Sequence, residues 1–137
     1  EDAIISLFDA NRPFFNKDQM LDLYESSVAH GCSCPGRAVT NGVAKIDNNK
    51  IIEVPSKEDY IEFVTPEFMK YSLIKKSMSH SIKRKKCFVE YALSLKINPI
   101  ISNSLFLNMK LTYPDDVAHL EKVAIENKFQ KPKINTK

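Results

Sequence analysis

The sequence predicts a single α+β domain that is predominantly helical, with a small β-hairpin packed against amphipathic helices. Three observations favour this fold class: residues 65–96 are long, periodic and charged as a helix would be, residues 16–29 form a second amphipathic pattern, and residues 43–54 hold two short apolar arms around a turn. At 137 residues, 43% of them apolar, the chain can bury one core. We therefore expect one globular domain over residues 1–129 and a basic flexible tail over residues 130–137.

The first elements are expected to be helical. Residues 3–9 are a short apolar run that fits one or two helical turns. A longer helix is predicted to begin at Asn16, whose side chain can cap it, and to end at about Ala29, just before Gly31. Its buried face is expected to consist of Met20, Leu21, Tyr24 and Val28.

Residues 30–36, HGCSCPG, are expected to form a loop, because glycine and proline interrupt regular backbone. Two of the three cysteines lie in this segment. Three interpretations stay open. Cys32 or Cys34 forms a disulfide with Cys87, or all three thiols stay reduced and only pack. In the third, a soft metal ion is bound by His30, Cys32, Cys34 and a more distant Cys87 or His80. The disulfide is preferred because Cys-x-Cys lacks the two-residue spacer of structural zinc sites. We expect no metal and no cofactor.

The segment 43–54 gives the clearest β pattern. Its residues 47–50, Asp-Asn-Asn-Lys, tolerate left-handed backbone and separate the two arms of a hairpin. Residues 60–64 alternate as a third strand would, whereas residues 56–59 could cap a short helix instead.

A long basic helix is predicted over residues 65–96. Thr65 is a suitable N-cap, Pro66 suits the first helical position, and Glu67 lies near the positive end of the helix dipole. Serines near its middle compete for backbone hydrogen bonds, so we expect a break at residues 79–83. A cationic arc on this helix is the candidate contact surface, formed by Lys75, Lys76, His80, Lys83, Arg84 and Lys86.

Two further helices are expected towards the C-terminus. Asn98-Pro99 can open a helix that continues to Leu111, although the alternating leucines before Leu111 also fit a strand. The last helix is predicted to begin at residues 114–116 and to bury Val117, Leu120 and Ala124.

The charge distribution suggests a binding protein. The net charge is only +3, but acids outnumber bases in residues 1–31 and bases outnumber acids in residues 66–96. The sequence has no glycine-rich phosphate loop, no His-Glu-x-x-His and no Gly-x-Ser-x-Gly. We therefore expect no enzyme but a non-catalytic protein-binding module, whose basic arc meets an acidic partner protein.

The location and the alternatives follow from the same features. No apolar run is long enough to span a bilayer. The absence of an initiator methionine and the expected disulfide favour an exported protein, periplasmic or secreted, such as an inhibitor, an immunity protein or a secretion-accessory protein. The alternatives are a nucleic-acid-binding protein that uses the basic face from Lys75 to Lys86, and a small thiol- or metal-dependent enzyme.

Overall fold

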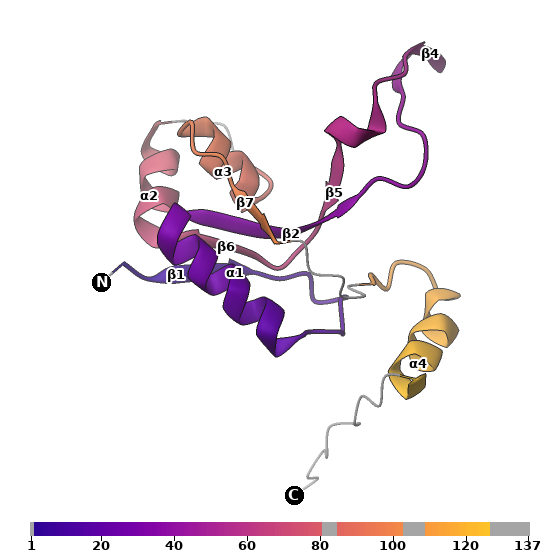
Figure 1. The fold of residues 1–137 in the computed structure, drawn as a ribbon, viewed down its shortest axis with the longest axis horizontal. Helices are drawn as coiled ribbons and strands as arrows, with labels where there is room; N and C mark the ends of the chain where they lie inside the picture. Colours follow the sequence, from indigo (N-terminus) through magenta and orange to yellow (C-terminus); the bar gives the residue numbers. More distant parts are fainter. Residues whose placement is uncertain (1, 81–84, 103–108, 127–137) are drawn as a thin grey trace, which may run out of the picture.

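A mixed five-stranded sheet forms the centre of the molecule (Figure 1). The computed structural model describes residues 2–80, 85–102 and 109–126. The strands of the sheet are β1 (Ile4–Leu7), β2 (Cys32–Ala38), β5 (Ile61–Phe63), β6 (Glu67–Lys70) and β7 (Ile100–Ser102). The remaining elements are α1 (Lys17–His30), α2 (Tyr71–His80), α3 (Phe88–Ser94), α4 (Asp116–Glu126), the 3-10 turn η1 (Lys57–Asp59), and a hairpin of β3 (Lys45–Asp47) and β4 (Lys50–Glu53).

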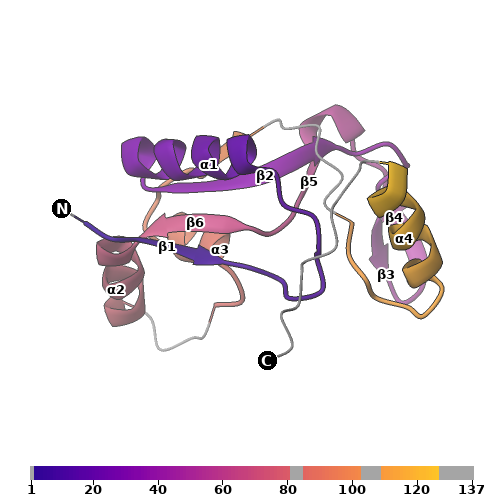
Figure 2. The same cartoon turned by 90° about the horizontal axis from the view of Figure 1, so that it is seen from below.

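The strand order is β1-β6-β2-β5, and β7 also pairs with β2. Strand β6 is antiparallel to both β1 and β2, whereas β7 is parallel to β2, so β1, β2 and β7 run in the same direction. Helix α1 covers one face of the sheet, and α2 and α3 lie on the other (Figure 2). The chain is therefore an α/β protein with a helix-covered sheet, and the prediction of a predominantly helical domain with a packed hairpin is wrong.

Helix α1 begins and ends where the sequence predicts. The Asn16 side chain accepts a hydrogen bond from the backbone N–H of Gln19 at 3.0 Å. Gly31 has a φ of 95° at the C-terminal end, and its N–H donates to the carbonyl of Ser27 at 2.8 Å. Glycine adopts this left-handed backbone without a Cβ penalty, so it ends the helix at low cost.

The buried face of α1 differs from the predicted one. Gln19, Leu23 and Ser27 point inwards, while the predicted Leu21, Tyr24 and Val28 are exposed. The Ser33 hydroxyl of β2 donates to the carbonyl of Leu23 at 2.6 Å. The small buried residues Ser27 of α1 and Ser33 of β2 let the helix and the strand approach closely. A prediction based only on the spacing of apolar residues does not detect this kind of buried face.

Strand β2 occupies the segment that the sequence indicates as a loop. Residues 32–36 are buried and pair with β6, β5 and β7. Gly36 has a packing role, because a Cβ there would lie 2.5 Å from Cγ2 of Ile101 and 3.0 Å from Cδ1 of Ile61. The glycine that indicates a loop in the sequence instead lets two neighbouring strands close over β2.

The predicted long helix is also wrong. The Thr65–Pro66 peptide bond is cis and leads into strand β6, whose Phe68 and Met69 are buried. Helix α2 begins only at Tyr71 and ends at His80, inside the expected break, and α3 is a separate helix. Residues 65–67 resemble the start of a helix, but they lead into β6, a buried strand that lies between β1 and β2.

Two apolar clusters hold the layers together. The first lies between the sheet and α2 and α3, and consists of Cys32, Met69 and Ala92 with Leu73, Ile74, Phe88, Tyr91 and Ile97. The second joins α4 to the segment before α1, and consists of Phe14, Leu120 and Val123 with Met109 and Ala124. The last helix is therefore confirmed, with Leu120 buried as predicted and Val117 exposed.

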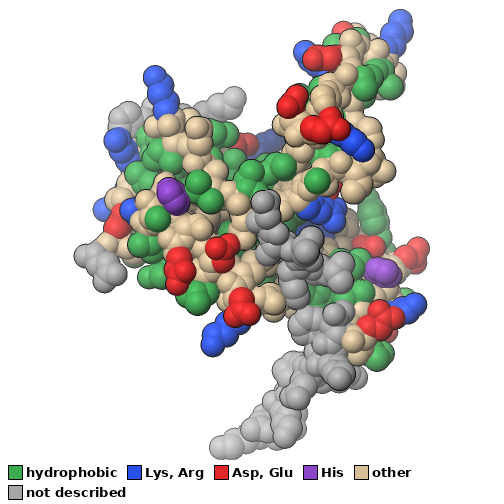
Figure 3. All heavy atoms as spheres, viewed as in Figure 1, with side chains coloured by type: hydrophobic (Ala, Val, Ile, Leu, Met, Phe, Trp, Pro, Cys, Tyr) green, Lys and Arg blue, Asp and Glu red, His purple; other side chains and the backbone are tan. Residues whose placement is uncertain are grey.

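The hairpin of β3 and β4 forms, but it does not pack on helices as predicted. Asn48 and Asn49 have φ values of 45° and 61° at its turn. Every residue from Lys45 to Glu53 is exposed, and the hairpin projects from the body (Figure 1). The space-filling view shows acidic and basic side chains along this arm (Figure 3).

The remaining predictions have mixed outcomes. Residues 3–9 contain strand β1 instead of a helix. Of the two alternatives for residues 60–64, the strand forms as β5, but it pairs with β2 and not with the hairpin, and residues 57–59 before it form the 3-10 turn η1. The helix expected from Asn98 is wrong at β7, while residues 103–108 and the predicted tail, residues 130–137, lie outside the described residues. None of the helices in the described ranges has the length and apolar character needed to cross a membrane.

Candidate functional site

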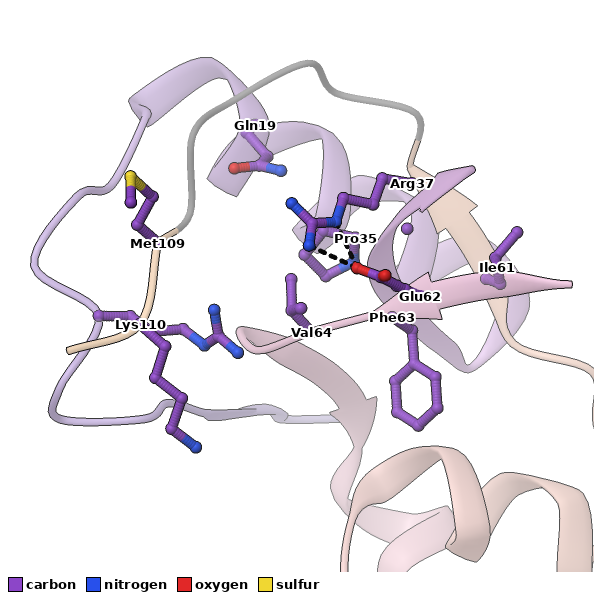
Figure 4. Close-up of a pocket in the computed structure, with 11 residues that line it drawn as sticks. Gln19, Pro35, Arg37, Ile61, Glu62, Phe63, Val64, Met109 and Lys110 are labelled. Carbon is purple, nitrogen blue, oxygen red and sulfur yellow. Dashed lines mark hydrogen bonds and ion pairs between the residues drawn. The ribbon is translucent and has the colours of Figure 1, made fainter. Parts of the chain in front are cut away.

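The candidate site lies where the parallel strands end. Because β1, β2 and β7 run in the same direction, the segments that follow their carboxyl ends gather at one edge of the sheet, which is where open α/β sheets bind ligands. A cavity of about 630 Å³ lies there. It is lined by Arg12, Gln19, Pro35, Gly36, Arg37, Ile61, Glu62, Phe63, Val64, Met109 and Lys110 (Figure 4).

A carboxylate holds two of the cations of this cavity. Oδ2 of Asp9 accepts from Nε of Arg12 at 3.1 Å and lies 3.3 Å from Nζ of Lys110. Burial raises the pKa of Asp9, but the hydrogen bonds from Arg12 and Lys110 outweigh it and lower this pKa below its usual value. Asp9 is therefore ionised at neutral pH and holds both cations at the cavity.

Hydrogen bonds that involve backbone and side-chain groups fix the two segments that carry these cations. The Asn11 side-chain amide donates to the carbonyl of Leu111 at 2.8 Å, and the Leu111 N–H donates to the carbonyl of Asn11 at 2.8 Å. The Asp9 N–H also donates to the hydroxyl of Thr65 at 3.2 Å. Residues about 100 positions apart in the sequence are thus joined at one site. The Arg12 side chain is only 12% exposed there, which restricts its orientation.

A second ion pair lies across the cavity. Arg37 of β2 and Glu62 of β5 are directly opposite each other in the antiparallel pair. Oε2 of Glu62 accepts from Nε of Arg37 at 2.6 Å and lies 2.5 Å from its Nη2. Figure 4 shows this pair on one side of β5, with the Phe63 side chain extending to the other.

The lining has an excess of positive charge. It contains three cations, Arg12, Arg37 and Lys110, and one carboxylate, Glu62; with Asp9, which contacts two of these cations, the excess is one positive charge. Guanidinium and ammonium groups donate strong hydrogen bonds to phosphate oxygens, and apolar side chains between them reduce competition from water. This arrangement is suited to a ligand that carries phosphate groups.

The cationic arc predicted from the sequence does not take part in this cavity. Lys75 and Lys76 are exposed on α2, which lies at the opposite end of the sheet from β5 (Figure 1). Nζ of Lys75 lies 4.6 Å from the ring centroid of Tyr71. Lys86, which lies shortly before α3, is exposed, whereas Lys83 and Arg84 lie outside the described residues. Partner binding by Lys75, Lys76, His80, Lys83, Arg84 and Lys86 stays a prediction.

The expected disulfide is not formed. Cys32, Cys34 and Cys87 are all free thiols. Burial, followed by the neighbouring charges, raises the pKa of Cys32 and of Cys34 to about 12. Thiols with such pKa values are packing groups and poor nucleophiles. No cluster of three or more histidine, cysteine or acidic side chains in the described parts of the chain could hold a metal ion.

Sequence reasoning missed Arg12, Arg37, Glu62 and Lys110. Each is an isolated charge in its own segment, and no spacing between them is regular. The one signal in the sequence is that Asp9 and Arg12 directly follow an apolar run of strand length, which the prediction assigned to a helix.

Comparison with known proteins identifies similar folds. No family model matches the sequence. The chain is 23% identical over 133 residues to a chloroplastic 2-C-methyl-D-erythritol 4-phosphate cytidylyltransferase from Oryza sativa subsp. japonica, covering 92% of this chain and 44% of that protein. It is 30% identical over 74 residues to the enzyme of the same name from Thermosipho africanus, covering 54% of this chain and 33% of that protein.

Solved structures give a similarity over most of the chain. The 2-C-methyl-D-erythritol 4-phosphate cytidylyltransferase of Thermus thermophilus superposes with a TM-score of 0.75 at 16% identity, covering 89% of this chain and 62% of that one. The one from Francisella tularensis gives 0.76 at 19% identity, covering 88% and 59%. This chain has their fold. It spans between about a third and a little over half of the length of the curated relatives that it matches.

These similarities overturn three predictions. The expected non-catalytic protein-binding module is wrong, because the similar proteins are cytidylyltransferases, and the expectation that the chain is not an enzyme fails with it. Of the alternatives, an enzyme agrees better with the matches. The exported location is also contradicted, because the similar proteins are cytidylyltransferases, one of which is named as chloroplastic.

Proposed function

We propose that this chain takes part in the transfer of a cytidylyl group from CTP to 2-C-methyl-D-erythritol 4-phosphate. The observation that carries the proposal is the cationic cavity at the carboxyl edge of the sheet, where Arg12 and Lys110 share the carboxylate of Asp9. The similarity in sequence and fold to cytidylyltransferases supports the choice of reaction and of acceptor.

The chemistry of this reaction explains the need for such a site. A phosphate oxygen of the acceptor forms a bond to the α-phosphorus of CTP. The bond from that phosphorus to the oxygen that bridges to the β-phosphate breaks, and pyrophosphate leaves. Both reactants are polyanions, so catalysis depends on holding them in line and neutralising their charge.

The described residues supply the charge for one of these phosphate groups. Arg12 is held by Asp9 and restricted by burial, so little of its freedom is lost when a phosphate binds. Lys110 is more exposed and adds a second charge from a segment that hydrogen bonds fix to the first. Asp9 orients both cations and is therefore a positioning residue.

Binding of 2-C-methyl-D-erythritol 4-phosphate to the Lys110→Ala variant tests the proposal. Removing one charge-assisted contact to phosphate should weaken binding about tenfold to a hundredfold, measured by isothermal titration calorimetry. Lys45→Ala is the matched control, because Lys45 is also an exposed lysine in an ion pair, with Glu53 at 3.6 Å, but lies on the projecting arm. The control should bind as the unchanged protein does.

The reaction itself is followed by pyrophosphate release from CTP in the presence of the acceptor. Release should require the acceptor and should fall in the Lys110→Ala variant but not in the Lys45→Ala variant. Equal effects of the two substitutions, or no binding of the acceptor by the unchanged protein, would contradict the proposal.

A further inference from the structure

We propose that Glu62, held in place by Arg37, recognises hydroxyl groups of the phosphorylated acceptor and so determines which phosphate ester the cavity prefers. This inference rests on the proposed function, because it concerns the same cavity. It adds a specificity-determining residue that the cationic groups alone do not supply.

The geometry leaves part of the Glu62 carboxylate available. Both contacts from Arg37, at 2.6 Å and 2.5 Å, end on the same oxygen, Oε2. Among the described residues, no hydrogen bond or ion pair ends on the other oxygen of Glu62, Oε1. The Glu62 side chain is 44% exposed. A carboxylate has room for about four hydrogen bonds on its two oxygens. Oε1 can therefore accept hydrogen bonds from a ligand.

Arg37 fixes the direction of this acceptor. The two residues occupy opposite positions on neighbouring antiparallel strands, so the backbone sets their separation. Two contacts from one guanidinium restrict the torsion angles of Glu62. Arg37, whose own side chain is 75% exposed, is consequently a positioning residue that favours one orientation of the Glu62 carboxylate.

The charges of the cavity separate two kinds of ligand group. A carboxylate accepts hydrogen bonds from hydroxyl groups but repels phosphate oxygens, whereas Arg12 and Lys110 attract phosphate. A phosphate ester with hydroxyl groups can use both ends of the cavity. An ester that has an unsubstituted alkyl chain binds only to the cations and donates no hydrogen bond to Oε1 of Glu62.

The remaining lining near Glu62 strengthens this discrimination. Pro35, Ile61, Val64 and Met109 have no side-chain hydrogen-bond donor, so the Gln19 amide is the uncharged side-chain donor among the residues that line the cavity. A site that hydrogen-bonds a ligand hydroxyl discriminates strongly against an analogue that lacks it. The discrimination is larger than that of an apolar pocket between two ligands that differ by one methylene. Hydrogen bonds to charged groups correspond to about tenfold to a hundredfold in affinity.

The test compares two ligands on four proteins by isothermal titration calorimetry. The ligands are 2-C-methyl-D-erythritol 4-phosphate, which has hydroxyl groups, and butyl phosphate, which has a four-carbon chain and none. The proteins are the unchanged chain, Glu62→Ala, Glu62→Gln and the control Glu53→Gln. Glu53 is matched because it is likewise exposed and paired across two antiparallel strands, with Lys45, but lies on the arm.

The unchanged chain and the control should prefer the hydroxylated ester about tenfold or more. Glu62→Ala should lose this preference while binding butyl phosphate as well as before or better, since a repulsive charge is removed. Glu62→Gln keeps one carbonyl oxygen and should retain part of the preference. A structural role alone would weaken both ligands equally and leave their ratio unchanged.

Failure of this inference differs from failure of the proposed function. If the unchanged chain binds both esters and Glu62→Ala leaves their ratio unchanged, the role of Glu62 is refuted and the phosphate site remains. If the unchanged chain binds neither ester, the proposed function is refuted and the role of Glu62 with it.

Discussion

Replacing Gly36 with alanine should destabilise the protein at the point where β5 and β7 meet β2. The added Cβ would lie 2.5 Å from Cγ2 of Ile101 and 3.0 Å from Cδ1 of Ile61. Carbon atoms pack at about 3.5 Å or more, so one neighbour must move by about 1 Å. Overpacking of this kind costs about 1–3 kcal/mol, and the lost flexibility of the unfolded chain offsets up to about 1 kcal/mol. We expect the free energy of unfolding to fall by about 1–2 kcal/mol.

Gly42 provides the matched control. A Cβ at Gly42 would meet no atom within 4 Å, so Gly42→Ala should leave stability unchanged or raise it by up to about 1 kcal/mol. Urea denaturation followed by far-ultraviolet circular dichroism measures both variants. Adding Ile101→Ala to Gly36→Ala removes the closest contact, and the two substitutions should cost less together than the sum of their separate effects. Equal stability of the two glycine variants would refute this account of the packing at β2.

Three further predictions concern other parts of the fold. Asn16→Ala removes the cap of α1 and should lower the free energy of unfolding by about 1 kcal/mol in urea denaturation, an expectation that an unchanged midpoint would contradict. Gly31→Ala should cost more than Asn16→Ala, because its φ of 95° strains an alanine and its Cβ would lie 2.7 Å from Cδ1 of Leu73; a smaller loss would be evidence against that backbone geometry. Burial raises the pKa of Glu67, and hydrogen bonds from the N–H groups of Val89 and Phe88 oppose part of this shift. Protonated Glu67 therefore contributes stability below the unfolded pKa of about 4.5, and this contribution is lost as the pH rises through the folded pKa. The unfolding free energy of the native chain should therefore fall relative to Glu67→Gln as the pH rises, and parallel pH profiles would show that Glu67 does not titrate as inferred.

The sequence was sufficient where local interactions decide the structure. The cap at Asn16 and the stop at Gly31 define α1 because each acts on backbone within a few residues. The turn at Asn48 and Asn49 is likewise local, since both residues tolerate the left-handed backbone that it requires.

The central strands could not be recognised in this way. Strand β2 contains glycine and proline, and β6 follows a threonine and a proline that resemble a helix start. Their identity depends on pairing with strands that are distant in the sequence, so local preference was overruled by the sheet. The wrong assignment of β6 also created the long basic helix on which the functional prediction rested.

The candidate site was hidden for a related reason. Arg12 and Lys110 meet only because β1 and β7 run in the same direction and end at the same edge. Without the strand order, nothing in the sequence relates the two charges. Prediction of the sheet would have had to precede prediction of the site.

The hairpin of β3 and β4 has a consequence for how the protein opens. Its residues from Lys45 to Glu53 are all exposed, and two strands alone are only marginally stable in water. The hydrogen bonds between these strands can therefore break while the central sheet stays intact. In a native-state hydrogen-exchange experiment, the amides of β3 and β4 should exchange through local opening, whereas those of β2 and β6 should exchange only when the whole domain unfolds.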